Sequence, residues 1–315
     1  MAMAIQKRPG FARPHPNKAW LRFRRRIPLL AMVIPGLIFL AVFNYYPMLG
    51  LQVAFKDFSF NSGIWRSPWT GLDNFYFLYS SDFWQSVVNT FTLTFGRLIL
   101  GFPAPIILAL IFNEIRSPVY KRLVQTISYM PYFVSWVVVA GILQAFLNMD
   151  NGVINQVLRL LGMHAVNYLG KPEFFKVLFW GSSFWVGTGF GTVIYLAAIA
   201  GINPELYEAA SMDGAGRLAQ IRHITLPCLM PTISILLVLN MPGLLSAGYN
   251  QILPLMNAGN QSAAEVIDTY IVRMGLGQGQ YAFTTALTLI MSILSLFVVT
   301  SSSYVSGRLG GTELF

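Results

Sequence analysis

The sequence predicts an all-α, polytopic membrane protein with six transmembrane helices, and two observations carry this prediction. Of the 315 residues, 55% are hydrophobic and only 10% are charged, whereas a soluble protein carries about 25% charged residues. Apolar stretches of about 20 residues, long enough for a helix that crosses the roughly 30 Å of hydrocarbon, also recur along the chain. The six predicted spans are 27–46, 86–112, 123–146, 176–201, 232–255 and 282–305.

The N-terminal tail, residues 1–26, holds eight of the 21 basic residues and no acidic residue. Basic segments beside a first span stay on the cytoplasmic side, so we expect a cytoplasmic tail. Six spans then return the C-terminal tail, 308–315, to the same side. The tail suits anionic lipid headgroups better than a specific binding arm, and this charge distribution argues against a nucleic-acid partner.

The first span is too long for the apolar core of a signal peptide and lacks a clear cleavage site, so it is expected to remain as an anchor. Residues 47–85 follow as an outside loop, because charged residues interrupt them. This loop carries eleven aromatic residues. They indicate a belt at the membrane interface, with contact to a periplasmic partner or a sugar ring as the alternative.

Arg97 lies in the middle of the second predicted span. A charge at that depth costs at least about 2.5–3.5 kcal/mol, so Arg97 is expected to face the bundle or a watery path, either as a structural partner or as a substrate contact. In the fourth span, Gly187 and Gly191 form a GxxxG pair that predicts close helix packing. A short helix is expected at 153–161, in the outside loop before that span.

A polar segment, residues 203–231, interrupts the apolar C-terminal half, and we call it the knob. Asn203 is predicted to cap a helix that begins at Pro204, where a missing N–H costs nothing. This helix is expected to end near Met212, where Asp213 and Gly214 supply a turn.

A second short helix of the knob, 215–224, is expected to stop before Pro227, since residues that precede proline disfavour the helical conformation. An ordinary helical hairpin between two spans is one alternative. A DNA-binding helix-turn-helix is another, but only Arg217 and Arg222 are basic here.

The knob carries a spaced pattern: Glu208-Ala209-Ala210, three residues, Gly214, nine residues, then Ile224-x-Leu226-Pro227. This pattern resembles the EAA loop of permease subunits of ABC importers. Four further stretches are similar to the N-terminal half of permeases in the polysaccharide and oligosaccharide branch, some of which import uronate oligosaccharides such as alginate fragments. These stretches are Ile34-Pro35-Gly36, Tyr46-Pro47-Met48, Ala54-Phe55-Lys56-Asp57 and Gly71-Leu72-Asp73-Asn74-Phe75.

The resemblance implies a type I ABC importer permease fold in the bacterial inner membrane and a role in carbohydrate translocation. It also implies a second homologous permease, two cytoplasmic ATPases and an extracytoplasmic solute-binding protein as partners. By the same resemblance, the residues that couple the permease to its ATPase are Glu208, Ala209, Ala210, Gly214, Ile224, Leu226 and Pro227.

The sequence shows no phosphate-binding loop, since its only Gly-Lys pair, Gly170-Lys171, is followed by Pro172. No catalytic constellation with a recognisable local signature is present, and the three histidines are scattered. We therefore expect no enzymatic activity, cofactor or metal in this chain, with ATP and Mg²⁺ bound by the partner ATPases.

A sugar path is expected to be lined by aromatic rings, which stack on sugar faces, and by amides, which bond hydroxyls. The candidates are Arg97, Trp180, Trp185, Tyr195, Asn240, Tyr249 and Asn250, and ordinary packing is the alternative for each. A self-sufficient secondary carrier or channel is the second functional hypothesis. It is disfavoured because the predicted spans lack acidic residues, although a sodium site built from backbone carbonyls would leave no such signal.

Overall fold

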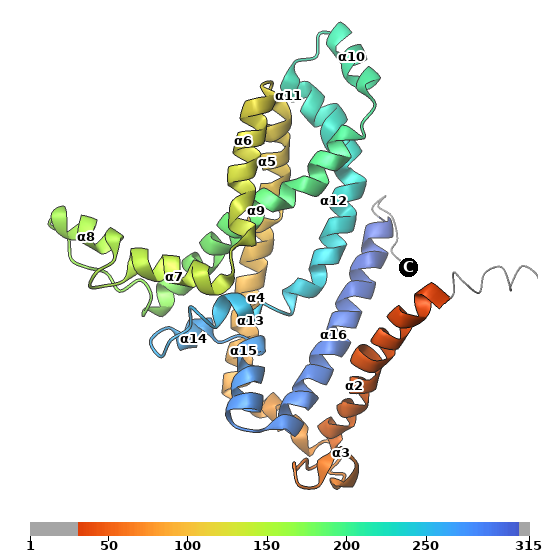
Figure 1. Cartoon of the computed structure of the whole chain (residues 1–315), viewed down its shortest axis with the longest axis vertical. Coiled ribbons are helices and arrows are strands. Elements are labelled where there is room, and N and C mark those ends of the chain that lie inside the picture. Colours follow the sequence, from red (N-terminus) through yellow and green to blue (C-terminus); the bar gives the residue numbers. More distant parts are fainter. Residues whose placement is uncertain (1–30, 309–315) are drawn as a thin grey trace, which may run out of the picture. The chain divides into compact units, whose positions relative to one another are not determined.

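A computed structural model describes residues 31–308, with side chains described as far as residue 304. Within this range the protein is built from helices joined by turns and loops, and it contains no strand (Figure 1). Five helices are long and apolar enough to cross a membrane, and a bent helix pair raises the number to six. The predicted fold class is thereby confirmed. The N-terminal tail, residues 309–315 of the C-terminal tail and the start of the first predicted span lie outside the described residues.

The chain divides into two compact units, residues 1–52 and 53–315. The described part of the first unit belongs to one helix, which begins by Ala31 and continues to Phe55 rather than ending at residue 46. It proceeds through η1 (Ala41–Tyr45), α2 (Tyr46–Met48) and the 3-10 helix η2 (Leu49–Phe55). Pro47 does not end it: Pro47 follows the π turn η1, in which Tyr46 N–H bonds Ala41 O, and the helix continues into η2.

In the second unit, α4 (Ser81–Gly101) and α5 (Pro103–Glu114) form one apolar stretch that corresponds to the second predicted span. α9 (Pro172–Ala200) packs against both of them and against α6 (Pro118–Tyr129). α12 (Leu226–Asn240) packs against α9 and α16 (Tyr281–Arg308).

The third predicted span, 123–146, is not one straight helix. α6 continues through η4 (Met130–Phe133), and α7 (Trp136–Leu147) then leaves at an angle of 100°. Pro131 occupies the first turn of η4, and the Ser135 side chain accepts a hydrogen bond from the backbone N–H of Val138. The serine thus caps a new helix, and the chain changes direction between Phe133 and Trp136.

The glycines of α9 pack differently from the predicted GxxxG pair. A Cβ added at Gly189 would clash with the Ser128 backbone, and one added at Gly191 would come within 2.8 Å of Pro105 Cγ, but one added at Gly187 would meet nothing within 4 Å. Close approach to α9 therefore depends on Gly189 and Gly191, whereas Gly187 lines open space.

The helix of the fifth predicted span, called the fifth long helix below, begins inside the knob. α11 (Arg217–Gln220), η5 (Ile221–Thr225), α12 and η6 (Met241–Leu244) form one stretch of 28 residues. The predicted stop before Pro227 is wrong, because η5 is a π turn in which Leu226 N–H bonds Ile221 O, and Pro227 then falls in the first turn of α12. The predicted end at residue 255 is also too late, because the helix gives way after η6.

The end of the second unit opposite α10 is formed by the loop around α3 (Gly63–Arg66) and η3 (Asp73–Tyr79) (Figure 1). Phe77 and Phe83 are buried there in one cluster with Tyr270 and Phe283. The interfacial belt predicted for this loop is therefore wrong for these two rings, which form a core, while side chains such as Trp65 and Tyr79 are exposed.

The remaining helices are short. They are α8 (Val153–Leu160), α10 (Pro204–Met212), α13 (Tyr249–Ile252), α14 (Gln261–Ala264), α15 (Ile267–Val272) and the π turn η7 (Arg273–Gly277). α8 falls within the predicted range of 153–161. α13 to α15 pack beside α4, α7 and α9.

Candidate functional site

The knob is a helix, a glycine turn and the start of the fifth long helix. α10 begins at Pro204, and the Asn203 side chain accepts a hydrogen bond from Glu205 N–H, as the sequence predicts. After Met212 the chain reverses at Gly214, whose φ is +80°. Ala215 N–H then bonds Ala210 O at 2.8 Å, which is the six-to-one bond of a Schellman C-cap.

Side-chain hydrogen bonds fasten α10 to the helix that follows. Tyr207 Oη and Thr225 Oγ1 lie 2.9 Å apart, and Gln220 Nε2 donates to Ser211 Oγ at 2.9 Å. Arg217 also pairs with Glu114 at the end of α5, with 3.2 Å between Nη1 and Oε2. α10 is therefore held to the start of the fifth helix at two points.

The structure brings the predicted coupling residues onto this one feature. Glu208 and Ala209 are exposed on α10, and Ala210 is half-buried behind them. Ile224, Leu226 and Pro227 belong to the helix at the base of the knob. Sequence reasoning missed two apolar side chains on the outer surface, Met212 at 88% exposure and Leu218 at 79%. Large apolar residues in an otherwise polar segment were the signal.

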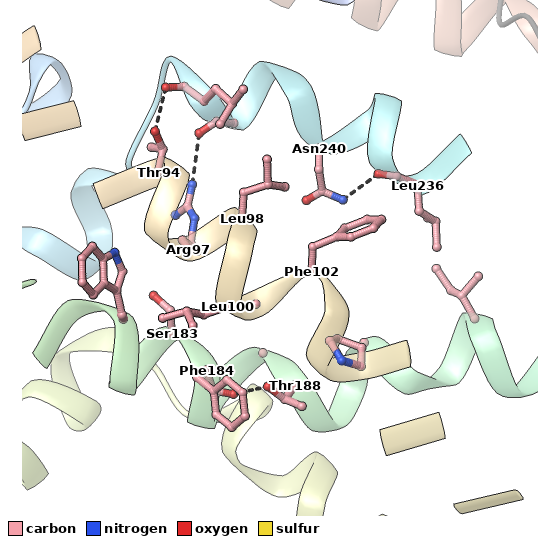
Figure 2. A pocket seen from close by; sticks show the side chains of 18 of the residues that line it. Thr94, Arg97, Leu98, Leu100, Phe102, Ser183, Phe184, Thr188, Leu236 and Asn240 are labelled. Carbon is pink, nitrogen blue, oxygen red and sulfur yellow. Dashed lines mark hydrogen bonds between the residues drawn. The ribbon is translucent and has the colours of Figure 1, made fainter. Parts of the chain in front are cut away.

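A cavity of about 370 Å³ lies between α4, α5, α9 and α12 (Figure 2). Arg97, Thr94, Ser183, Thr188 and Asn240 supply polar side chains to its lining. Trp180 and Phe184 supply aromatic ones. The lining thus combines a cation, hydroxyls, an amide and aromatic rings, which suits a polar solute with apolar ring faces.

The cavity gathers four of the seven substrate-path candidates: Arg97, Trp180, Tyr195 and Asn240. Trp180 is anchored, since its Nε1 donates to Leu93 O at 2.9 Å. Tyr195 is 3% exposed and packs in a core cluster with Leu229. Asn240 is exposed, and its Nδ2 donates to Leu236 O at 2.7 Å.

Trp185, Tyr249 and Asn250 are not among the residues that line this cavity. Tyr249 and Asn250 belong to α13, beyond the end of the fifth long helix, and both are exposed. Their neighbour Gln251 is 4% exposed instead, and its Nε2 donates to Phe179 O and to the hydroxyls of Ser182 and Ser183. Gln251 therefore ties α13 to α9.

Arg97 is held by backbone carbonyls. Nη1 donates to Ala247 O at 2.9 Å, and Nη2 donates to Ser246 O at 3.1 Å and to Gly243 O at 3.2 Å. Thr94, one turn earlier on α4, donates to Leu244 O at 3.0 Å. The guanidinium therefore makes the structural pairing that was one of its two predicted roles, while its side chain also lines the cavity.

An ion pair joins the residues that flank α15, outside the predicted spans. Arg273 Nε lies 2.6 Å from Glu265 Oε1, and Nη2 lies 3.1 Å from Oε2, so the contact is bidentate. The hydrogen bonds that Arg273 donates to Glu265 raise the pKa of Arg273, while burial raises the pKa of Tyr270, over whose ring the guanidinium lies. No group of three or more potential metal-ligating side chains is found among residues 31–304.

Comparison with known proteins gives the chain its family. The family described as binding-protein-dependent transport system inner membrane component matches residues 101–310. Protein LplB of Bacillus subtilis is 40% identical over 288 residues, covering 91% of each chain. The polygalacturonan/rhamnogalacturonan transport system permease protein YteP of the same organism is 39% identical, covering 91% of this chain and 90% of its own.

The solved structures agree. A chain in the crystal structure of a bacterial ABC transporter involved in the import of the acidic polysaccharide alginate superimposes with a TM-score of 0.86 at 40% identity. The match covers 93% of this chain and 99% of that one. The chain is thus a member of the family of inner membrane components of binding-protein-dependent transport systems, a permease subunit of an ABC transporter.

Proposed function

We propose that this permease subunit imports oligosaccharides that carry uronic acids. The observation that carries the proposal is its likeness, over nine-tenths of its length, to two permeases whose names refer to acidic polysaccharides: the alginate transporter at 40% identity and the polygalacturonan/rhamnogalacturonan permease at 39%. The cavity supports it, because its lining offers hydroxyl, amide and aromatic groups together with the positive charge of Arg97.

The importer contains a second permease, two cytoplasmic ATPases and an extracytoplasmic solute-binding protein. A solved complex of the alginate transporter with its alginate pentasaccharide-bound periplasmic protein, 39% identical to this chain, supports this assembly. ATP and Mg²⁺ bind to the ATPases, and both termini of this chain face the cytoplasm with the knob. A self-sufficient carrier, the other functional hypothesis, has no observation in its favour now that the family is established.

The knob transmits the work of the ATPase. Met212 and Leu218 enter an apolar cleft of the ATPase, because burying such exposed side chains favours association. Ala209 permits close approach, and Glu208 pairs with a basic residue or with backbone donors of the cleft. Closure of the ATPase dimer then draws the knobs of the two permeases together and moves the long helices between inward- and outward-facing arrangements.

Purification of the tagged chain in mild detergent tests the assembly. We expect stoichiometric ATPase and a second permease to accompany it, and a lone homo-oligomer that moves solute without nucleotide would overturn the proposal. In proteoliposomes with the solute-binding protein, a uronate pentasaccharide should stimulate ATP hydrolysis, whereas a neutral pentasaccharide of equal length should not. Equal stimulation by both sugars would refute the acidic specificity.

Charge at the knob is tested separately. Glu208→Lys should leave the protein inserted but abolish substrate-stimulated hydrolysis, because it reverses the charge presented to the ATPase. Glu208→Gln is the matched control, since it keeps the shape and removes only the charge. Normal uptake by Glu208→Lys would contradict the assigned role of the knob.

A further inference from the structure

The segment between α12 and α13 interrupts a long helix beside the cavity. η6 ends at Leu244, and Leu245 N–H makes a last 3-10 hydrogen bond to Pro242 O. The chain is then non-helical up to Gly248, whose φ of +87° suits glycine. Such a break leaves carbonyl groups without intrahelical partners. Side chains from elsewhere in the protein provide donors for four of them.

α4 provides them. The three carbonyls bonded by Arg97 belong to Gly243, Ser246 and Ala247, and Thr94 serves Leu244. Thr94 and Arg97 are three residues apart, so both project from one face of α4 toward the break. Figure 2 shows the two side chains reaching the same stretch of backbone. Four carbonyls of the break are thus satisfied by one helix.

Asp268 on α15 accepts hydrogen bonds from donor groups of the same break. Its Oδ2 accepts hydrogen bonds from Ser246 Oγ at 2.9 Å and from Gly248 N–H at 3.0 Å. Among the described residues, neither Asp268 nor Arg97 forms a salt bridge within 4.0 Å. The cation therefore faces carbonyl oxygens and the anion faces N–H and O–H donors, with the backbone of the break between them.

The same face of α4 continues this attachment toward α15. Thr90 Oγ1 accepts a hydrogen bond from Ile267 N–H at 2.9 Å, next to Asp268 in the chain. Asn89 Nδ2 donates to Ser262 O at 2.8 Å and to Glu265 O at 2.9 Å. α15 and the break are consequently fixed to one helix rather than to each other alone.

We propose that Arg97 and Asp268 are positioning residues that hold the backbone of residues 241–248 as a wall of the cavity. Their joint effect is to set the shape of the route along which the solute passes. The proposal rests on the proposed function only in taking the cavity as that route. The hydrogen bonds that define the wall belong to the protein alone.

Direct contact with a solute carboxylate is the competing role for Arg97. A guanidinium has five N–H donors, and three hydrogen bonds to carbonyls already orient this one. A carboxylate that drew the guanidinium away would leave the carbonyls of Gly243, Ser246 and Ala247 without donors. The geometry therefore favours the positioning role, and the two roles predict opposite effects of removing Asp268.

Hydrogen–deuterium exchange on the assembled importer in lipid nanodiscs tests the wall without any solute. In Arg97→Met and Asp268→Ala, amides in peptides that cover 243–249 should exchange faster by roughly tenfold to a hundredfold, the range for one lost hydrogen bond to a charged group. Asp268→Asn keeps an acceptor oxygen and should restore much of the protection. Unchanged exchange in both Arg97→Met and Asp268→Ala would overturn the proposal.

Arg159→Met is the matched control. Arg159 also donates to two carbonyls, Asp150 O at 2.8 Å and Met149 O at 2.9 Å, but it lies on α8 and does not line the cavity. Its removal should leave exchange across 243–249 as in the unaltered protein. Faster exchange there would mean that the effect reports general loosening and would count against a local wall.

Uptake of a uronate pentasaccharide separates the two roles of Arg97. If Arg97 and Asp268 hold the wall together, Asp268→Ala lowers uptake by about the same factor as Arg97→Met, and the double variant is little worse than either single one. If Arg97 binds the carboxylate, removing the nearby negative charge leaves uptake unchanged or raises it, and the proposal fails. The exchange experiment still decides the wall if the transported solute proves to be another sugar.

Discussion

Gly214 offers the sharpest test of how the knob works. Its φ of +80° lies in the left-handed region, and a Cβ added there would meet no atom within 4 Å. Gly214→Ala therefore introduces no clash, and its cost is purely conformational, about 1–2 kcal/mol for an L-residue in that region. One or two kcal/mol lowers the population of the native turn by roughly fivefold to thirtyfold.

The expected order follows from backbone preferences. Asparagine tolerates the left-handed conformation better than alanine, so Gly214→Asn should transport more solute per ATP than Gly214→Ala. Gly214→Pro should be the worst variant, because proline fixes φ near −65° and removes the N–H that bonds Ser211 O at 3.1 Å. Gly216→Ser is the matched control, since Gly216 has an ordinary φ of −70° and equally open surroundings.

The assay is uptake in proteoliposomes with ATP hydrolysis measured in parallel, so that coupling is read as solute moved per ATP. Protein amount and membrane insertion are checked by quantitative blotting, and both should be unchanged because the turn lies outside the spans. Equal coupling in the unaltered protein, Gly214→Ala and Gly214→Pro would refute the idea that this turn positions α10.

Two further predictions concern packing and surface charge. Gly96→Ala should lower the thermal midpoint of the purified importer by an amount equivalent to about 1–3 kcal/mol, because the added methyl would clash with the Trp180 ring. Gly187→Ala is the control and should be neutral, since an added Cβ there would meet nothing within 4 Å. Equal midpoints for the two variants would contradict the packing of α4 on α9. Arg217→Ala should change the thermal midpoint little, because the side chains of Arg217 and Glu114 are 53% and 35% exposed and such surface pairs contribute about 0–1 kcal/mol. A large drop of the midpoint would show instead that this ion pair holds the knob in place.

Local chemistry was enough to predict α10. Asn203, Pro204 and Gly214 are each residues whose preferred conformation matches one position of the helix and its turn, so no distant contact was needed. The bend of the third span also had a local signal in Pro131 and Ser135, a proline followed by a serine cap. That signal is weaker than the apolar run around it.

Other features depended on distant residues. Pro242, Gly243 and Gly248 weaken the fifth helix locally, but the position of its end depends on Thr94 and Arg97, about 150 positions earlier, which satisfy its carbonyls. The passage of the helix through Pro227 required a π turn, which has no reliable sequence pattern. The cavity likewise combines α4, α9 and α12, so the candidates that line it could be named by residue type but not separated from Trp185, Tyr249 and Asn250.

The continuous helix from Arg217 to Leu244 fixes the rotational orientation of α10 relative to the cavity. Its 28 residues span about 42 Å, so the base of the knob and the first part of the cavity wall, residues 241–244, belong to one helix. Each residue of a helix turns by about 100°, so one extra residue between Arg217 and Thr225 would swing α10 through that angle relative to the cavity. Four extra residues would rotate α10 by about 400°, close to its original orientation, while lengthening the helix. Comparing uptake in the two insertion variants would therefore show whether transport depends on the orientation of α10 or on the length of the helix.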